Sequence, residues 1–257
     1  MTRHLLVIGA QRCGTTYLHD QLAAHPQVAM ARPHRPEPKV FLSAELAGRG
    51  REWYRETYFA HARNETVLGE KSTSYLEHPE AAERAAAVLG DPLVLVQLRD
   101  PVARAVSHWA FSSDAGLETR SLADALAANL EGPLAWDRTL TSVSPFAYLE
   151  RGRYVDYLQP WLDRFGDDVT VLFLEEMRRG PAAVADLYAA IGVDPAFRPP
   201  APATAVNESR QHKPHLDDHL LARLGEHFHD SDRALARLLG RPLPWADRPA
   251  TTKEDEQ

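Results

Sequence analysis

The stretch IGAQRCGTTYL, from Ile8 to Leu18, is the part of the sequence whose residue types and spacing most clearly suggest chemistry. It has a glycine, four residues and a second glycine, as a phosphate-binding loop has, but Thr15 stands where that loop's lysine is expected. The apolar run before it and the pattern after it predict a strand, a turn through Gly9 and Gly14, and a helix. Backbone N–H groups and the helix dipole then converge on one point, so we expect an anion site.

The missing lysine limits which anion the loop can hold. In P-loop nucleotide triphosphatases that lysine reaches the β- and γ-phosphates, and the following Ser or Thr holds Mg²⁺. Here the cation comes earlier, at Arg12, and the apolar run 93–98 is followed by Arg99 rather than by an aspartate that could assist magnesium. Hydrolysis of ATP is therefore disfavoured, although a nucleotide or metabolite kinase stays open as an alternative.

Short β-branched apolar runs alternate with helical patterns along the chain, which is typical of a parallel sheet covered on both faces by helices. Proline opens three of the expected helices, where its missing N–H costs nothing. The predicted strands are 4–8, 66–69, 93–98 and 169–174, and the predicted helices are 15–24, 79–89, 101–112, 154–165 and 181–191, with a further helical segment near the end. Such proteins bind ligands beyond the carboxyl ends of the strands. Two long irregular segments, 31–39 and 195–215, interrupt the pattern and are candidates for function.

Composition sets the broad class. The chain has 257 residues, 44% of them hydrophobic, which suits one domain over residues 1–245, followed by a mobile polar tail at 246–257. A net charge of -7 argues against a nucleic-acid partner. Cys13 is the only cysteine, so an intrachain disulfide is excluded and a reducing, cytoplasmic location is expected. The apolar start is too short for a signal-peptide core, and no apolar run is long enough to span a membrane.

Four stretches follow one another in a fixed order: AQRCGTTYL, EPKVF, EKSTSYL and LVLVQLRDPVARAVSHW. A fifth, RGRYVDYLQPWLDRFGDDVTVLFLEEM, ends at Met177. Together they resemble the sulfotransferases that use 3'-phosphoadenosine 5'-phosphosulfate (PAPS), in particular the heparan-sulfate-type enzymes and related bacterial members. The resemblance implies an α/β, P-loop-like three-layer fold with a central, mainly parallel sheet flanked by helices.

The resemblance also implies a reaction and its residues. The sulfuryl group of PAPS would pass in line to a hydroxyl, less readily to an amine, of a sugar-containing or other small-molecule acceptor, leaving adenosine 3',5'-bisphosphate (PAP). Glu37 matches the catalytic base, and Lys71 and Arg12 match the groups that stabilise the leaving phosphosulfate, although the family usually has lysine in place of Arg12. The residues expected to bind the donor are Gln11, Arg12, Cys13, Gly14, Thr15, Thr16, Tyr17, Arg99, Ser107, Tyr154, Arg210 and Lys213.

Several of these residues have other readings. Glu37 could merely pair with the cations of its own segment, Arg32, Arg35 and Lys39, and His34 is a rival base. The thiol of Cys13 could be reactive at a helix N-terminus or be simple packing.

The aromatic rings of Tyr75, Trp109 and Tyr154 could stack on adenine or belong to the core. No metal is expected: His215 and His219 are four residues apart, but no glutamate stands beside the first.

The acceptor is the least determined part of the prediction. Its pocket is expected to use segment 31–39, the stretch 113–145 and the late loop, and a basic rim would suit an anionic acceptor. High alanine and arginine content suggests a bacterial source and a role in natural-product biosynthesis. A non-catalytic protein that binds the bisphosphate nucleotide is a further alternative, and the sequence does not indicate an oligomeric state.

Overall fold

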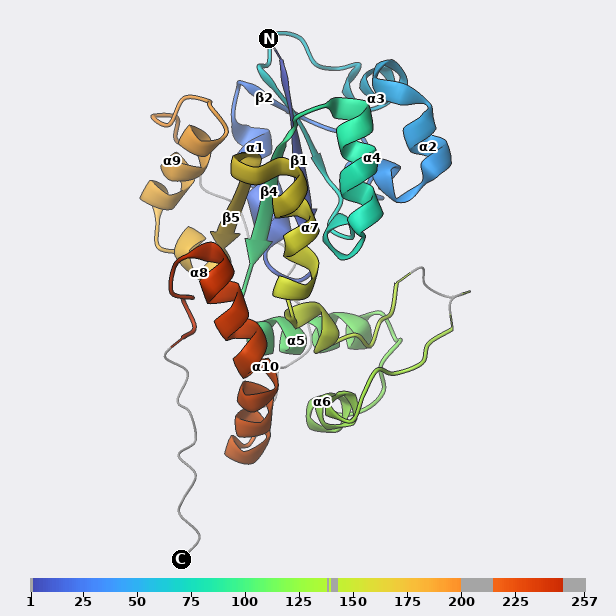
Figure 1. Cartoon of the computed structure of the whole chain (residues 1–257), viewed down its shortest axis with the longest axis vertical. Coiled ribbons are helices and arrows are strands. Elements are labelled where there is room, and N and C mark those ends of the chain that lie inside the picture. Colours follow the sequence, from blue (N-terminus) through green and yellow to red (C-terminus); the bar gives the residue numbers. More distant parts are fainter. Residues whose placement is uncertain (1, 138, 140–142, 200–214, 247–257) are drawn as a thin grey trace, which may run out of the picture. The chain divides into compact units, whose positions relative to one another are not determined.

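A parallel sheet forms the centre of the fold, as the sequence predicts. In the computed structural model, which describes residues 2–137, 139, 143–199 and 215–246, the strand order is β2-β3-β1-β4-β5 (Figure 1). The strands are β1 (Arg3–Gly9), β2 (Val28–Met30), β3 (Val67–Lys71), β4 (Leu93–Leu98) and β5 (Val169–Phe173). Each neighbouring pair is parallel. The predicted α/β class with a central parallel sheet is therefore confirmed.

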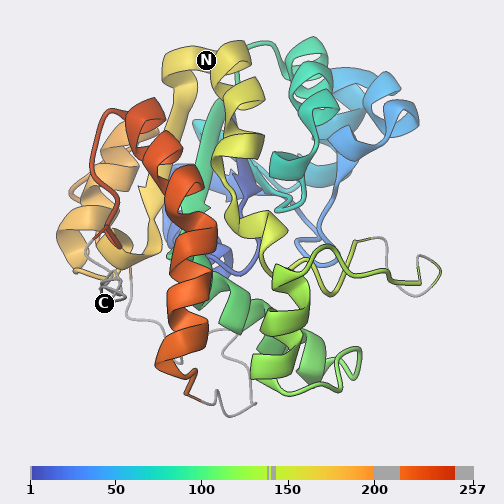
Figure 2. The same ribbon diagram turned by 60° about the horizontal axis from the view of Figure 1, so that its bottom comes forward.

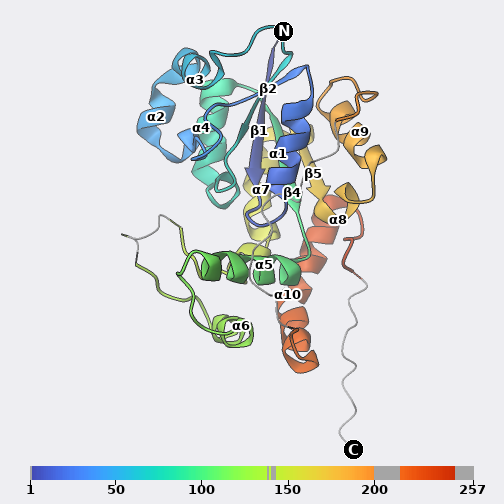
Figure 3. The same cartoon turned by 180° about the vertical axis from the view of Figure 1, so that it is seen from behind.

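Helices cover both faces of this sheet. Helices α1 and α9 lie on one face, and α4 and α7 lie on the other (Figures 1 and 3). On the α1 and α9 face, Leu5 and Val7 of β1 pack in one apolar cluster with Leu18 of α1 and Leu187 of α9. The helices are α1 (Thr15–Ala24), α2 (Ala44–Gly48), α3 (Gly50–Phe59), α4 (Pro79–Leu89), α5 (Pro101–Asp114), α6 (Leu122–Leu130), α7 (Val155–Phe165), α8 (Leu174–Met177), α9 (Pro181–Ala190) and α10 (Asp218–Leu239), with short 3-10 turns at Val40–Leu42, Tyr75–Glu77, Glu150–Gly152 and Gly166–Asp168.

The predicted elements are present, and the sequence missed some others. Strand β4 and helices α1 and α4 have the predicted bounds, and α5 extends two residues further, to Asp114. Strand β2 was missed because three residues are too few to show an alternating pattern. Helices α2, α3, α6 and α8 were also missed, and Leu174, predicted as the end of a strand, begins α8. Helix α3 buries only Tyr54 and Phe59, and charged residues dilute its few apolar ones.

The described residues fall into two compact units. The first belongs to Met1–Arg99 and Tyr157–Asn207 and contains the sheet, and the second belongs to Asp100–Asp156 and Glu208–Gln257. In the second unit α5, α6 and α10 pack on one another around their own apolar cluster (Figure 2). The single domain over 1–245 stays a prediction, and the predicted tail lies outside the described residues except for Ala246. None of the helices in the described ranges combines the length and apolar character needed to span a membrane.

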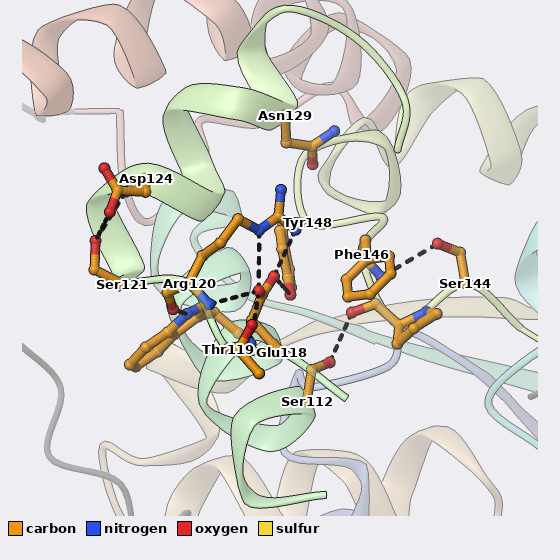
Figure 4. A network of polar contacts seen from close by, with 12 residues as sticks. Ser112, Glu118, Thr119, Arg120, Ser121, Asp124, Asn129, Ser144, Phe146 and Tyr148 are labelled. Atoms are coloured by element: carbon orange, nitrogen blue, oxygen red, sulfur yellow. Dashed lines mark hydrogen bonds and ion pairs between the residues drawn. The ribbon is translucent and has the colours of Figure 1, made fainter. Parts of the chain in front are cut away.

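A buried carboxylate in the second unit fixes the ends of the stretch 113–145, which was predicted to line the acceptor pocket. Glu118, with a side chain only 2% exposed, accepts hydrogen bonds from Arg120 Nη2 at 2.7 Å and Tyr148 OH at 2.8 Å (Figure 4). Burial alone would raise the pKa of Glu118, but hydrogen bonds from Arg120 and Tyr148 outweigh burial and hold this pKa below its usual range. Ser112 Oγ donates to the Pro145 carbonyl at 2.6 Å and joins the two ends directly.

Replacing this carboxylate should destabilise the protein. Glu118→Gln should lower the free energy of unfolding at pH 7 by about 1–3 kcal/mol, because buried charge-assisted hydrogen bonds are lost. A carboxyl group with a lowered folded-state pKa contributes its stability above its unfolded-state pKa and loses it as the pH falls. The difference between wild type and variant, measured by urea unfolding, should therefore shrink in acid. Glu131→Gln is the control, since Glu131 is 76% exposed where it pairs with Arg223. Equal losses in the two variants would contradict the role of burial.

Candidate active site

The carboxyl ends of three parallel strands bring most predicted site residues of the first unit to one edge of the sheet. Strand β1 leads into the loop 10–14, β3 ends at Lys71, and β4 is followed by Arg99. The register places Val7 of β1 beside Lys71 of β3. Parallel strands start their connections at the same edge, so residues more than eighty positions apart in the sequence become neighbours.

The loop between β1 and α1 has the backbone of an anion site. Arg12 and Gly14 adopt positive φ angles of 67° and 78°. Gln97 Nε2 donates to the carbonyl of Cys13 at 2.6 Å and holds the loop from β4. Helix α1 begins at Thr15 with no capping side chain at Gly14. Helix N-termini bind phosphate through their first N–H groups, so the start of α1 suits an anion.

Neighbouring side chains fix this loop further. Arg99 Nη1 donates to the carbonyl of Arg12 at 3.5 Å, so the predicted 3'-phosphate residue lies against the loop. Gln11 Nε2 donates to Ser74 Oγ at 3.1 Å, which ties the loop to the turn after β3. Cys13 is fully buried, as its packing interpretation requires. Gln97 is not among the residues predicted from the sequence, although a lone polar residue in the apolar run LVLVQL was a visible signal.

Glu37 and Lys71, the predicted base and cation, form an ion pair. Lys71 Nζ lies 2.6 Å from Glu37 Oε1, with side-chain exposures of 8% and 17%. Thr73 also holds this carboxylate, through its backbone N–H at 2.9 Å from Oε2 and its hydroxyl at 3.0 and 3.1 Å from the two oxygens. Glu37 therefore bonds the strand end and not the cations of its own loop, Arg32, Arg35 and Lys39. Thr73 was not recognised from the sequence.

Two histidines lie beside this ion pair. His34, from the segment that carries Glu37, is exposed and stacks on His19 of α1 with ring centroids 5.0 Å apart. His19 is buried, and Nδ1 contacts Asp20 at 3.1 Å. Burial lowers the pKa of His19, and the positive charge of Lys71 lowers it further while Asp20 opposes the shift. His34 stays a rival base, because it belongs to the same segment as Glu37 and stacks on a histidine that the charge of Lys71 affects.

Comparison with known proteins decides the family. Residues 5–64 match a family model described as "Sulfotransferase family". A bifunctional heparan sulfate N-deacetylase/N-sulfotransferase 1 from Caenorhabditis briggsae is 32% identical over 188 residues, which cover 70% of this chain and 21% of that protein. A sulfotransferase structure from Alicyclobacillus acidocaldarius superimposes with a TM-score of 0.77 at 26% identity, covering 96% of this chain and 100% of the other. The chain belongs to a sulfotransferase family.

The curated relatives are longer than this chain. A bifunctional heparan sulfate N-deacetylase/N-sulfotransferase 3 from Mus musculus is 28% identical over 274 residues, covering 93% of this chain and 30% of that protein. This chain thus spans less than a third of the two curated relatives named here. The bacterial structure is matched over its whole length, and its similarity confirms the P-loop-like fold predicted for this chain.

The remaining predicted site residues have different outcomes. Ser107 is buried on the second turn of α5, and Tyr154 is fully buried with its ring 6.4 Å from Trp245. Both belong to the second unit, so their contacts with a donor stay predictions. Arg210 and Lys213 lie outside the described residues.

The aromatic candidates are mostly core residues. Tyr75 is fully buried, and its hydroxyl bonds Glu70 at 2.7 Å. Trp109 is 6% exposed and donates from Nε1 to the carbonyl of Arg120. Packing therefore accounts for the rings of Tyr75 and Trp109.

Thr16 and Tyr17, which are predicted to bind the donor, are half-buried on the first turn of α1.

Gly14→Ala should destabilise the protein more than Gly166→Ala. Both glycines have positive φ, which costs alanine about 1–2 kcal/mol. A Cβ at Gly14 would lie 2.6 Å from Leu174 Cδ1 and 2.9 Å from Gln97 Nε2, whereas at Gly166 it meets nothing within 4 Å. We expect an additional loss of about 1–3 kcal/mol at Gly14 from overpacking, measured by urea unfolding. Equal losses would mean that the loop relaxes around the added carbon.

Proposed function

We propose that this sulfotransferase transfers the sulfuryl group of PAPS to a hydroxyl, or less readily an amine, of a glycan or other small-molecule acceptor and releases PAP. The Glu37–Lys71 ion pair carries this proposal, because it sets a base and a cation 2.6 Å apart where the carboxyl ends of the strands meet the anion loop. Membership of a sulfotransferase family supports the reaction class.

The residues present fit a donor with anionic groups at both ends. The N-terminus of α1 and the positive-φ loop before it suit the 5'-phosphosulfate. Arg99, which already contacts this loop, suits the 3'-phosphate. The full set proposed to bind the donor is Gln11, Arg12, Cys13, Gly14, Thr15, Thr16, Tyr17, Arg99, Ser107, Tyr154, Arg210 and Lys213.

In the proposed reaction Glu37 takes the proton of the acceptor hydroxyl while the acceptor oxygen forms its bond to sulfur. The bond between sulfur and the leaving phosphate oxygen breaks, and its electron pair stays on that oxygen. Lys71 and Arg12 offset the charge that develops there. An ammonium group has three N–H donors, so Lys71 can keep Glu37 and still reach the leaving oxygen. Arg12 does not release a proton, so any proton given to the leaving group comes from Lys71.

The acceptor is proposed from the chemistry around Glu37. Arg32 and Arg35 are exposed on the same segment, and Lys39 is half-buried, so the rim suits an anionic acceptor. Two relatives are named for the N-sulfation of heparan sulfate, which supports a glycan and keeps an amine open as the acceptor group. The cytoplasmic location and the role in bacterial natural-product biosynthesis stay predictions.

Binding of PAP tests the donor site. Isothermal titration should show binding of PAP without added metal, and Arg99→Ala should weaken it at least about tenfold, because a charge-assisted hydrogen bond contributes about 1.5–3 kcal/mol. The control Arg63→Ala removes an exposed arginine of the same unit and should leave the affinity unchanged. ATP with magnesium should bind poorly. Binding of ATP and not of PAP would favour the kinase alternative and overturn the proposal.

Turnover of PAPS tests the base. Release of PAP should be followed with four acceptors: de-N-sulfated heparan sulfate, chitin oligosaccharide, 4-nitrophenol and water. Glu37→Gln keeps a carbonyl for Lys71 but cannot take a proton, so the rate should fall about 10²- to 10⁴-fold with unchanged affinity for PAP. Glu45→Gln alters an exposed carboxylate and should match wild type. Undiminished turnover would place the base elsewhere, first at His34, and PAP binding without any wild-type turnover would indicate a non-catalytic protein.

A further inference from the structure

A buried carboxylate lies directly behind the ion pair and has no part in the reaction as described. Glu70 is the residue before Lys71 in β3, and it is 0% exposed. Adjacent residues of a strand point to opposite faces, so Glu70 enters the packing against α3 while Lys71 reaches the site. Burying an ionised carboxylate is costly unless hydrogen bonds compensate it. The hydrogen-bond partners of Glu70 therefore decide which role this carboxylate has.

Three hydroxyl groups donate to Glu70. Tyr54 OH lies 2.6 Å from Oε2, and Ser72 Oγ and Tyr75 OH lie 2.6 and 2.7 Å from Oε1. Burial raises the pKa of Glu70, the three hydrogen bonds oppose this shift, and the charge of Glu37 raises it again. The negative charge of Glu37, the proposed base, therefore acts on Glu70.

Two of these hydroxyls continue to the loop that carries Glu37. Ser72 Oγ accepts a hydrogen bond from the backbone N–H of Lys39 at 2.9 Å, and Tyr75 OH accepts one from the N–H of Phe41 at 3.1 Å. A hydroxyl has one proton, and here it goes to Glu70, because the N–H groups need a lone pair. Glu70 therefore sets the direction of both hydroxyls. Each path from Glu70 through a hydroxyl to the loop is an arm. The Ser72 arm ends at Lys39 and the Tyr75 arm ends at Phe41, two and four residues after Glu37.

Two features stabilise the hydrogen bonds of the arms. Burial raises the pKa of Tyr75 well above its usual value, and the negative charge of Glu70 adds to the shift, so the phenol keeps the proton that it donates. Lys39 adopts a positive φ of 52°, so the loop turns sharply at the residue that the Ser72 arm holds. An isolated loop would favour other backbone angles at this residue, and the arm offsets part of that preference.

We propose that Glu70 is a positioning residue of the active site, which fixes Glu37 against Lys71 and Thr73 through the Ser72–Lys39 and Tyr75–Phe41 arms. The role rests on the proposed function of Glu37 as the base. Glu70 touches neither donor nor acceptor in this proposal and acts only through the loop.

Tyr54 offers a matched control. Its hydroxyl donates to the other oxygen of Glu70, is equally buried, and makes no bond to the loop 37–41. Tyr54→Phe and Tyr75→Phe thus remove the same group from the same carboxylate, but only the second also cuts an arm. If Glu70 were only part of the packing, both variants would behave alike apart from their stability.

The experiment compares Ser72→Ala and Tyr75→Phe with Tyr54→Phe. Turnover of PAPS with the best of the four acceptors, water included, should fall about tenfold to a hundredfold in each arm variant, because a small displacement of a catalytic group costs this much. The affinity for PAP should stay the same, and Tyr54→Phe should retain most of the wild-type rate. Hydrogen exchange should accelerate at the amide of Lys39 in Ser72→Ala and at that of Phe41 in Tyr75→Phe, and at neither in Tyr54→Phe.

The conservative variant Glu70→Gln distinguishes loss of the hydrogen bonds from loss of the side-chain volume. In Glu70→Gln the amide carbonyl can still accept from both arms while the NH₂ group faces Tyr54, so most turnover should survive, whereas Glu70→Ala should lose it. Wild-type protein that releases no PAP from PAPS would overturn the proposed function itself. Wild-type activity together with arm variants no slower than Tyr54→Phe would overturn the positioning role alone.

Discussion

The turn that follows β3 is the constraint on which the candidate site depends. Four consecutive hydroxyl residues, Ser72 to Tyr75, bond two segments that are far apart in the sequence: the anion loop through Gln11, and the segment 37–41. The parallel register brings this turn to the edge where β1 also ends. A displacement of the turn would therefore move Lys71, the proposed base and one contact of the anion loop together.

Both compact units use a buried carboxylate for a related purpose. Glu70 in the first unit and Glu118 in the second are each surrounded by donors, and these donors anchor a long connecting segment in each unit. Apolar side chains of similar size could stabilise the core equally well, since buried charges often contribute little net stability. A carboxylate accepts from several directions at once, and this property fixes the geometry of loops in a way that apolar contacts do not.

The sequence predicted the parts of the site that depend on local patterns. The loop spacing and the following helix determine the anion site, and the strand ends determine where Lys71 and Arg99 lie. The sequence did not reveal that Glu37 bonds Lys71 and Thr73, or that Gln97 holds the Cys13 carbonyl, because these contacts join residues 34 to 84 positions apart. Strand β2 was missed because three residues are too few to show a pattern, and helix α3 because charged residues outnumber its buried ones.

The site also accounts for the threonine that stands in place of the P-loop lysine. In a nucleotide triphosphatase the lysine lies in the loop and approaches the terminal phosphate together with magnesium. Here Thr15 begins α1, and Lys71 comes from the neighbouring strand, where it holds Glu37. In the proposed reaction a cation in this position lies between the base and the leaving oxygen rather than beneath the phosphates. A sulfuryl group carries less negative charge than a terminal phosphate, so Lys71, which is shared with the base, and Arg12 can supply the stabilisation that a lysine and Mg²⁺ provide for a triphosphate.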